Sequence, residues 1–175
     1  EVYLMSVAAP LYDSQGNVIG AIETIHDITE RKQAEEQLLA SEQLFRALVE
    51  NSPDFIARYD REYRRIYVNP ATQRLFTGSA ESVLGKTPAD QSPLYAPQVY
   101  IEHLQQAIET ATESILEMPF RTAQGEMHWA QIRFVPEFDS EGKVATVLTI
   151  GRDIHEIKED ERRFRMLAEN FPDDK

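Results

Sequence analysis

Residues 137–156 read EFDSEGKVATVLTIGRDIHE, and residues 11–30 read LYDSQGNVIGAIETIHDITE. The two segments align without a gap at an offset of 126 residues, and each carries Asp-Ser-x-Gly, an apolar run and then Asp-Ile-x-Glu. A glycine turn followed by an apolar-rich run is typical of a hairpin and its second strand. Self-similarity at a fixed offset indicates a repeated unit, so we predict one partial and one complete copy of the same domain.

The pattern between these segments predicts an α+β domain. Alternating residues predict two strands, then short helices, a longer helix and three strands joined by tight turns. Asn69 caps the first short helix, which ends at Gly78, and Ser79 begins the next one. We expect a five-stranded antiparallel sheet with helices on one face, flanked by amphipathic linker helices. The predicted strands span residues 55–60, 65–68, 115–122, 128–138 and 144–152, and the longer helix spans 99–112.

The expected organisation follows from the repeat and the linkers. It comprises the hairpin of a preceding partial copy at residues 1–27, a helical linker at 28–52, a complete domain at 53–153 and the start of the next linker at 154–175. A lone hairpin is marginal in water, so we expect residues 1–27 to be disordered or paired with another chain. The run VATVLTI is apolar on both faces, which predicts a central strand with other elements packed on each face of the sheet. Phe45, Leu48 and Val49 of the linker are available as its second cover.

Each linker carries a sparse apolar stripe. The repeat resumes at RALVENSPD and RMLAENFPD, residues 46–54 and 165–173, so the two linkers differ in length by seven residues. Seven residues are one heptad, which keeps the stripe in phase. The pattern indicates helices that pair in a homodimer, and the alternative is an amphipathic helix packed on its own domain. On the first linker, Leu38, Phe45 and Ser52 lie seven apart, with Ala34, Ser41 and Leu48 at the complementary positions; on the second, Ile157, Phe164 and Phe171 form the same stripe, joined by Leu167. The residues expected at the dimer contact are Leu38, Phe45, Leu48, Ile157 and Phe164.

Both linkers begin with the same residue pattern. Asp27 precedes the first helix with Glu30 three residues later, and Asp153 and Glu156 repeat this arrangement. The spacing is that of a capping box, which fixes where a helix starts. We interpret these four residues as a stiff joint that relays movement of the sheet to the helix.

Composition excludes several classes of function. A formal net charge of −12 disfavours non-specific nucleic-acid binding. The absence of cysteine excludes disulfides, thiolate metal sites and a cysteinyl adduct to flavin. No apolar run approaches the roughly 20 residues needed to cross a bilayer, and no phosphate-binding glycine loop or zinc-protease motif occurs. We therefore expect a non-enzymatic, cytoplasmic segment without membrane contact, although a longer parent protein could carry a membrane anchor.

Seven short motifs occur in an order that resembles PAS sensory domains with their C-terminal PAC motif. They are ENSPDFIARYD, YVNPA, LFTG, VLGKT, GEMHW, VPEFDSEGKV and GRDI, and they lie between residues 50 and 154. The resemblance covers residues 44–157, and residues 1–30 look like the last two strands of a preceding copy. One departure is DIHE at Asp153, where the first copy keeps the usual Asp-Ile-Thr. The resemblance implies a five-stranded sheet, detection of a small molecule or protein, dimerisation and fusion to an output such as a histidine kinase or cyclase.

Candidate ligand-binding residues are mostly aromatic. Aromatic side chains could line a pocket for a flat ligand, with Asn69 or Arg133 supplying polar contacts, or they could simply be core. The aromatic candidates are Tyr59, Tyr67, Phe76, Tyr95 and Trp129. Some members of the resembled family bind haem through a helix histidine, which makes His103 a candidate ligand, although most such histidines only pack. We expect no cofactor. His155 aligns with Thr29 and is interpreted as a linker residue.

Two hypotheses of function remain. The first is a regulatory sensor module that detects a ligand or partner and relays the change through capped linker helices in a dimer. The second is an unliganded structural module for dimerisation and spacing, whose pocket is filled by its own side chains. A retained small molecule would favour the first hypothesis.

Overall fold

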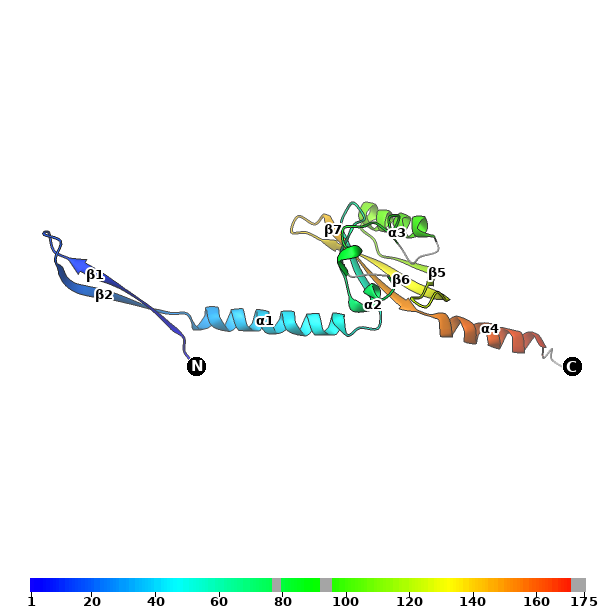
Figure 1. Cartoon of the computed structure of the whole chain (residues 1–175), viewed down its shortest axis with the longest axis horizontal. Helices are drawn as coiled ribbons and strands as arrows, with labels where there is room; N and C mark the ends of the chain where they lie inside the picture. Colours follow the sequence, from blue (N-terminus) through cyan, green and yellow to red (C-terminus); the bar gives the residue numbers. More distant parts are fainter. Residues whose placement is uncertain (77–79, 92–95, 171–175) are drawn as a thin grey trace. The chain divides into compact units, whose positions relative to one another are not determined.

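The computed structural model (Figure 1) describes residues 1–76, 80–91 and 96–170. Four positions singled out in the sequence lie outside the described residues, namely Gly78, Ser79, Tyr95 and Phe171. None of the described helices combines the length and the apolarity needed to cross a membrane.

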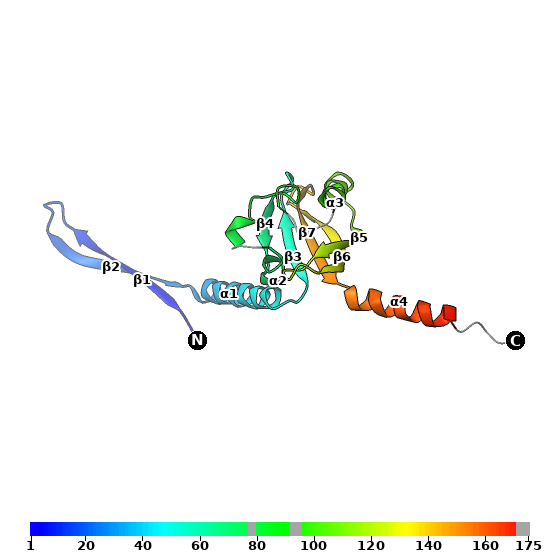
Figure 2. The same ribbon diagram turned by 45° about the vertical axis from the view of Figure 1, so that its right-hand side comes forward.

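Five strands form an antiparallel sheet in the order β4-β3-β7-β6-β5 (Figure 2). Their bounds are β3 Phe55–Tyr59, β4 Arg65–Val68, β5 Ser114–Arg121, β6 Met127–Phe138 and β7 Val144–Asp153. The central strand is β7, as its apolar residues on both faces predicted, and it pairs with β3 on one side and β6 on the other. The α+β architecture with a five-stranded sheet is therefore confirmed.

Within the described residues, the connection from β4 to β5 contains α2 (Pro70–Gln73), the 3-10 helix η1 (Ala80–Ser82) and α3 (Pro97–Thr110). Asn69 caps α2 as predicted, and Pro70 occupies its first turn. Helix α3 starts two residues earlier than predicted because Pro97, which lacks an N–H, suits the first turn. It ends before Ala111, whose φ of +54° lies in the left-handed region.

The hydrophobic core lies between the sheet and α3. Helix α3 buries Tyr100, Leu104 and Ala107, which follow helical spacing on one face. On the sheet, Phe134 of β6 and Val147 of β7 are both 0% exposed. We call this side of the sheet the inner face.

A bulge in the hairpin of β3 and β4 decides which β4 side chains reach the inner face. Ala57 pairs with Val68 and Arg58 pairs with Tyr67, but Tyr59 pairs with Arg65, so Ile66 is an extra residue. Successive side chains of a strand alternate between faces, and one extra residue reverses that alternation. Arg65 therefore lies on the inner face with Tyr59, whereas Tyr67 lies on the outer face with Arg58.

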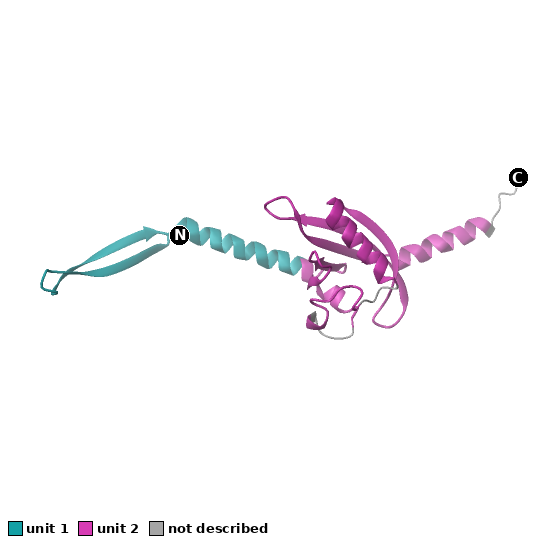
Figure 3. Ribbon diagram, turned by 90° about the horizontal axis from the view of Figure 1, so that it is seen from above, with its two compact units in different colours: residues 1–48 teal, residues 49–175 magenta. Residues whose placement is uncertain are grey.

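The chain divides into two units, residues 1–48 and residues 49–175 (Figure 3). The first unit holds the antiparallel hairpin of β1 (Leu4–Tyr12) and β2 (Val18–Asp27), followed by most of α1 (Thr29–Glu50). Every residue of both strands is exposed. The two strands pair with each other along their length, and the expectation that residues 1–27 are disordered or paired with another chain stays a prediction. Helix α4 (His155–Asn170) follows β7 in the second unit.

Hydrogen bonds in the two hairpins repeat at the offset seen in the sequence. Asp13 Oδ1 accepts from the backbone N–H groups of Gln15 and Asn17, and Asp139 Oδ1 accepts from those of Glu141 and Lys143. Ahead of the helices, Ile28 N donates to Tyr3 O (2.9 Å) and Ile154 N donates to Trp129 O (2.8 Å). The same backbone joint thus precedes α1 and α4.

Helix α1 buries none of its side chains. Phe45 and Leu48 are 63% and 65% exposed, while Leu148 and Ile150 on the outer face of β7 are half-buried. Cover of this outer face by linker residues therefore stays a prediction.

Candidate functional site

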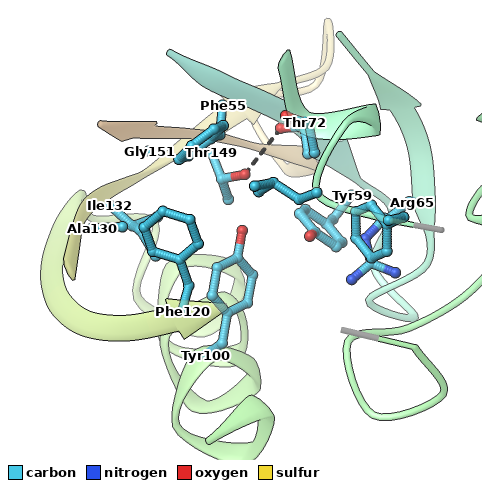
Figure 4. Close-up of a pocket in the computed structure, with 13 residues that line it drawn as sticks. Phe55, Tyr59, Arg65, Thr72, Tyr100, Phe120, Ala130, Ile132, Thr149 and Gly151 are labelled. Atoms are coloured by element: carbon cyan, nitrogen blue, oxygen red, sulfur yellow. Dashed lines mark hydrogen bonds between the residues drawn. The ribbon is translucent and has the colours of Figure 1, made fainter. Parts of the chain in front are cut away.

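A cavity of about 50 Å³ lies against the inner face of the sheet (Figure 4). Strands β3, β4, β5, β6 and β7 and helices α2 and α3 contribute to its wall, together with the residues just after α2. Its apolar lining residues are Phe55, Ala57, Leu75, Phe76, Phe120, Ala130, Ile132 and Gly151, and its polar ones are Tyr59, Arg65, Thr72, Tyr100 and Thr149. A mostly apolar concavity with a few converging polar groups is the usual form of a small-molecule site.

Tyrosine and threonine hydroxyls form the centre of the cavity. Figure 4 shows the hydroxyl group of Tyr100, on α3, pointing toward Thr149 of β7. Thr149 Oγ1 donates to the carbonyl oxygen of Ala57 (3.2 Å), and the rings of Tyr59 and Tyr100 lie 5.8 Å apart. Burial raises the pKa of Tyr100 well above its ordinary value, the neighbouring Tyr59 raises it further, and the charge of Arg65 opposes both effects.

The raised pKa of Tyr100 predicts a loss of stability in alkali. The folded state keeps its phenol protonated, so its contribution is fully present below the unfolded pKa of about 10 and is lost as the pH rises through the folded value. Urea unfolding at a series of pH values above 9 should show that the free energy of unfolding declines less steeply with pH for Tyr100→Phe than for the wild type. Tyr12→Phe, at a side chain 59% exposed, should leave the decline unchanged. Equal slopes for all three proteins would contradict the prediction.

Arg65 places a buried charge in the cavity wall. Only 2% of its surface is exposed. The guanidinium carbon lies 5.0 Å from the ring centre of Phe76 and 5.7 Å from that of Tyr59, within cation–π range. Its N–H groups donate to three backbone carbonyl oxygens, those of Lys86 (3.4 Å), Thr87 (3.3 Å) and Gln91 (2.9 Å). Across the part of the chain that the structure describes, no carboxylate forms an ion pair with Arg65; the paired arginines are Arg31, Arg58, Arg133, Arg152 and Arg163.

Of the ligand-binding candidates from the sequence, Tyr59 and Phe76 line the cavity. Asn69 is 0% exposed but joins three backbone segments instead of lining the cavity. Its Oδ1 accepts from Ile56 N (3.0 Å) and Thr72 N (2.9 Å), and its Nδ2 donates to Val49 O (3.2 Å) and Asp54 O (2.9 Å). Asn69 therefore holds β3 and α2 in place beside the cavity.

Tyr67, Trp129 and Arg133 do not line the cavity. The bulge in β4 directs Tyr67 outward, and Trp129 and Arg133 alternate with the buried Ala130 and Ile132 of β6. Arg133 instead pairs with Glu113, with Nη2 2.7 Å from Oε1. Lys158 of α4 lies over the ring of Trp129, at 6.0 Å from its centre.

His103 also lies away from the cavity lining. Its Nδ1 lies 2.9 Å from Ser114 Oγ, and its ring stacks on Phe134 at 5.2 Å. A cavity of about 50 Å³ is smaller than the roughly 150 Å³ that holds a single benzene, so it does not accommodate a haem. The residues present do not fit a haem bound through His103.

A compact set of contacts joins the cavity wall to the start of α4. Phe120 of the cavity contacts the His128 ring edge to face at 5.9 Å, and His128 stacks on His155 at 4.2 Å with an angle of 5° between the planes. Asp153 Oδ1 accepts from His155 N (2.9 Å), and its Oδ2 lies 2.6 Å from His128 Nδ1. Glu117 of β5 binds Lys158 of α4 at 2.7 Å. The first turn of α4 is thus attached to the sheet at several points.

Asp27 caps α1 as Asp153 caps α4, since its Oδ1 accepts from Thr29 N (2.9 Å). Hydrogen bonding by the side chain of Thr29, and then by its backbone N–H, lowers the pKa of Asp27. The glutamate half of the expected capping box is not formed: within the described residues, neither Glu30 nor Glu156 accepts a hydrogen bond from the backbone of its aspartate. The aspartate alone fixes each helix start.

Sequence reasoning missed four residues of this region, namely Arg65, Tyr100, His128 and His155. The helical spacing of Tyr100 with Leu104 and Ala107 marked it as core and so pointed toward the inner face. Arginine is usually exposed, and only the bulge and the three carbonyl groups around Arg65 explain its burial. Nothing in the sequence places His128 beside His155, because they lie 27 residues apart.

Comparisons with known proteins agree with this fold. Residues 49–159 match the PAS fold family, and residues 1–30 match the PAS domain family. The two-component sensor PprA of Pseudomonas aeruginosa is 26% identical over 151 residues, which are 86% of this chain and 16% of PprA. The chain thus spans less than a fifth of that relative.

Two solved structures illustrate the likeness in fold. The PAS domain of an HTR-like protein from Haloarcula marismortui has a TM-score of 0.56 at 21% identity, covering 70% of this chain and 99% of that one. VqmA of Vibrio cholerae, solved as a complex with ligand and DNA, has a TM-score of 0.57 at 20% identity, covering 65% of this chain and 50% of that one.

Proposed function

Because the chain belongs to the PAS family of sensory domains, which are regulatory modules and not themselves catalytic, we propose that it binds a small molecule and relays the change through α4. The observation that carries the proposal is the cavity, which combines apolar walls with converging hydroxyl groups directly on the central strand β7. The relay operates within a homodimer formed through α1 and α4.

The cavity has two physical connections to α4. Thr149 and Gly151 of β7 line it, and Asp153, two residues later, caps the helix. Phe120 also lines it and contacts His128, which holds the second oxygen of Asp153. A ligand that displaces Phe120 or shifts β7 therefore changes how the first turn of α4 is held.

The relatives support a role in signalling. PprA is named as a two-component sensor, and VqmA was solved with a ligand. By analogy, we propose that this module lies in the cytoplasmic part of a longer signalling protein and controls an output such as a histidine kinase or cyclase.

Gly151 offers a direct test, because a Cβ there would lie 3.5 Å from side-chain atoms of Ile132 and Phe55 at the cavity wall. Alanine therefore fits, while the two further methyl groups of valine must enter the cavity. In a thermal-shift screen of small metabolites, compounds that stabilise the wild type should also stabilise Gly151→Ala. Gly151→Val should lower their affinity by about tenfold or more, since filling a small pocket removes van der Waals contacts and adds strain.

Two further results would support the sensor: mass spectra of the purified protein that contain a retained compound, and loss of that compound in Gly151→Val. The rival function is a structural spacer, which the small size of the cavity favours. It would be supported if no compound stabilises the wild type and Gly151→Val melts at the same or a higher temperature.

The homodimer is proposed from apolar side chains exposed on both helices. The exposed fractions are 62% for Leu38, 63% for Phe45, 65% for Leu48, 55% for Ile157 and 73% for Phe164. Exposed apolar stripes on helices are typical of surfaces that meet a partner.

A charge within the stripe of α1 should weaken the dimer. Phe45→Lys removes two phenylalanine rings that the proposed dimer buries, one from each chain. Burying one such ring contributes about 1.5–3 kcal/mol, so we expect the dissociation constant to rise roughly 100-fold or more. Gln43→Lys introduces the same charge on the exposed, opposite side of α1 and should change it little. Sedimentation equilibrium measures both. Equal weakening of the dimer by both substitutions, or a monomeric wild type at high concentration, would contradict a dimer formed through this stripe.

A further inference from the structure

The charge of Arg65 is not neutralised by the described residues around it. Three backbone carbonyl oxygens accept its N–H groups, but these acceptors are neutral, and no carboxylate pairs with it in the described chain. A buried charge without a counter-charge is costly in a protein interior. The three bonds also use only three of the five N–H donors of a guanidinium.

We propose that the cavity binds small organic monocarboxylates and that Arg65 forms the ion pair with the bound carboxylate. The proposal rests on the ligand-binding function given above and specifies its ligand class. The carboxylate supplies the missing negative charge at the only cationic side chain among the described residues that line the cavity.

The surroundings of Arg65 favour a carboxylate over other anions. A guanidinium and a carboxylate are both planar and pair through two parallel hydrogen bonds. The hydroxyl groups of Tyr59 and Tyr100 lie in the same cavity and supply further donors. A phosphate would bring a second negative charge, for which the described lining has no second cation.

The remainder of the cavity sets the size and polarity of the ligand. Phe55 of β3, Phe120 of β5 and Ile132 of β6 supply an apolar wall, so the other end of the ligand is apolar. A volume of about 50 Å³ is well below that occupied by benzene in a protein cavity. Acids of two or three carbons, acetate and propionate, have fewer non-hydrogen atoms than benzene and come nearest to this space.

The experiment compares propionate with propionamide, which has the same shape without the charge. Titrations of the full 175-residue chain are followed by two-dimensional amide NMR. Propionate should bind at least about tenfold more tightly than propionamide, because only the anion forms the charged pair. The largest chemical-shift changes should fall on cavity residues, and Gly151→Val should abolish them.

Two arginine variants complete the test. Arg65→Gln should remove the preference for propionate, whereas Arg64→Gln, which deletes the same charge at the exposed neighbour, should keep it. If Arg65→Gln does not fold, the wild-type comparison decides alone. Equal binding of propionate and propionamide would overturn the carboxylate inference and leave the ligand-binding function intact.

Binding of propionate that persists in Gly151→Val would place the anion outside the cavity and would also overturn the inference. The same holds if acetate and propionate both fail to bind. The metabolite screen with Gly151→Ala and Gly151→Val then decides separately whether the cavity binds any ligand.

Discussion

Replacing Asn69 by alanine should lower the free energy of unfolding of the second unit by roughly 3–4 kcal/mol. The side chain is 0% exposed and satisfies two backbone N–H groups and two backbone carbonyl oxygens. Alanine removes this partner from Ile56 N, Thr72 N and Asp54 O, while Val49 O keeps its bond from Ser52 N (3.3 Å). Each buried group left without a partner costs about 1–3 kcal/mol unless water or a shift of the backbone satisfies it. Partial rescue of that kind explains why the expected loss is below the full sum.

Urea unfolding followed by the fluorescence of Trp129 measures this loss, because the protein has a single tryptophan and it lies in the second unit. Gln106→Ala, on the exposed side of α3, is the control and should change stability by less than about 0.5 kcal/mol. A loss below about 1 kcal/mol for Asn69→Ala would mean that Asn69 does not hold β3 and α2 together.

Replacing Phe134 by alanine should cost about 3–5 kcal/mol. Phe134 is 0% exposed on β6, and its ring contacts Tyr100 at 4.8 Å and His103 at 5.2 Å, both on α3. Removal of the ring forfeits its transfer energy and leaves a void that the sheet and α3 cannot fully close. The void adjoins Tyr100, so the variant should also bind cavity ligands less tightly.

The matched control is Phe138→Ala on the same strand, where the side chain is 55% exposed. Its cost should stay within about 1 kcal/mol, because little apolar surface is returned to water. Similar losses at both positions would indicate that α3 does not depend on the ring of Phe134.

The elements of the domain were largely predictable because each has a strong local signal. The strand at residues 144–152 was predicted by a continuous apolar run after a glycine turn, and β7 ends one residue later. Asn69 followed by Pro70 predicted the start of α2 because both residues satisfy the demands of a helix N-terminus. Such signals lie within a few neighbouring residues and need no knowledge of tertiary contacts.

The cavity was less predictable because long-range geometry decides which side chains line it. Tyr67 and Arg65 differ by two positions and should share a face, but the bulge at Ile66 separates them. Trp129 and Arg133 lie on one face of β6, and the buried Ala130 and Ile132 lie on the other. Because side chains alternate along a strand, this pattern in the sequence already indicates that Trp129 and Arg133 face outward. The prediction that Trp129 lines a pocket rested on its aromatic ring and not on its position in the strand.

Because the joints ahead of α1 and α4 match, the residues between them could be deleted without changing the local structure at the start of the helix. A splice from Ile28 directly to His155 would delete 126 residues and still leave an aspartate two positions before the backbone N–H that donates to its carboxylate. The closing bond from Ile28 to Tyr3 would stand in for the bond from Ile154 to Trp129. A gene that encodes two matching joints can gain or lose a whole copy of the domain in a single recombination event. The helix after the joint then keeps the same orientation relative to the hairpin before it.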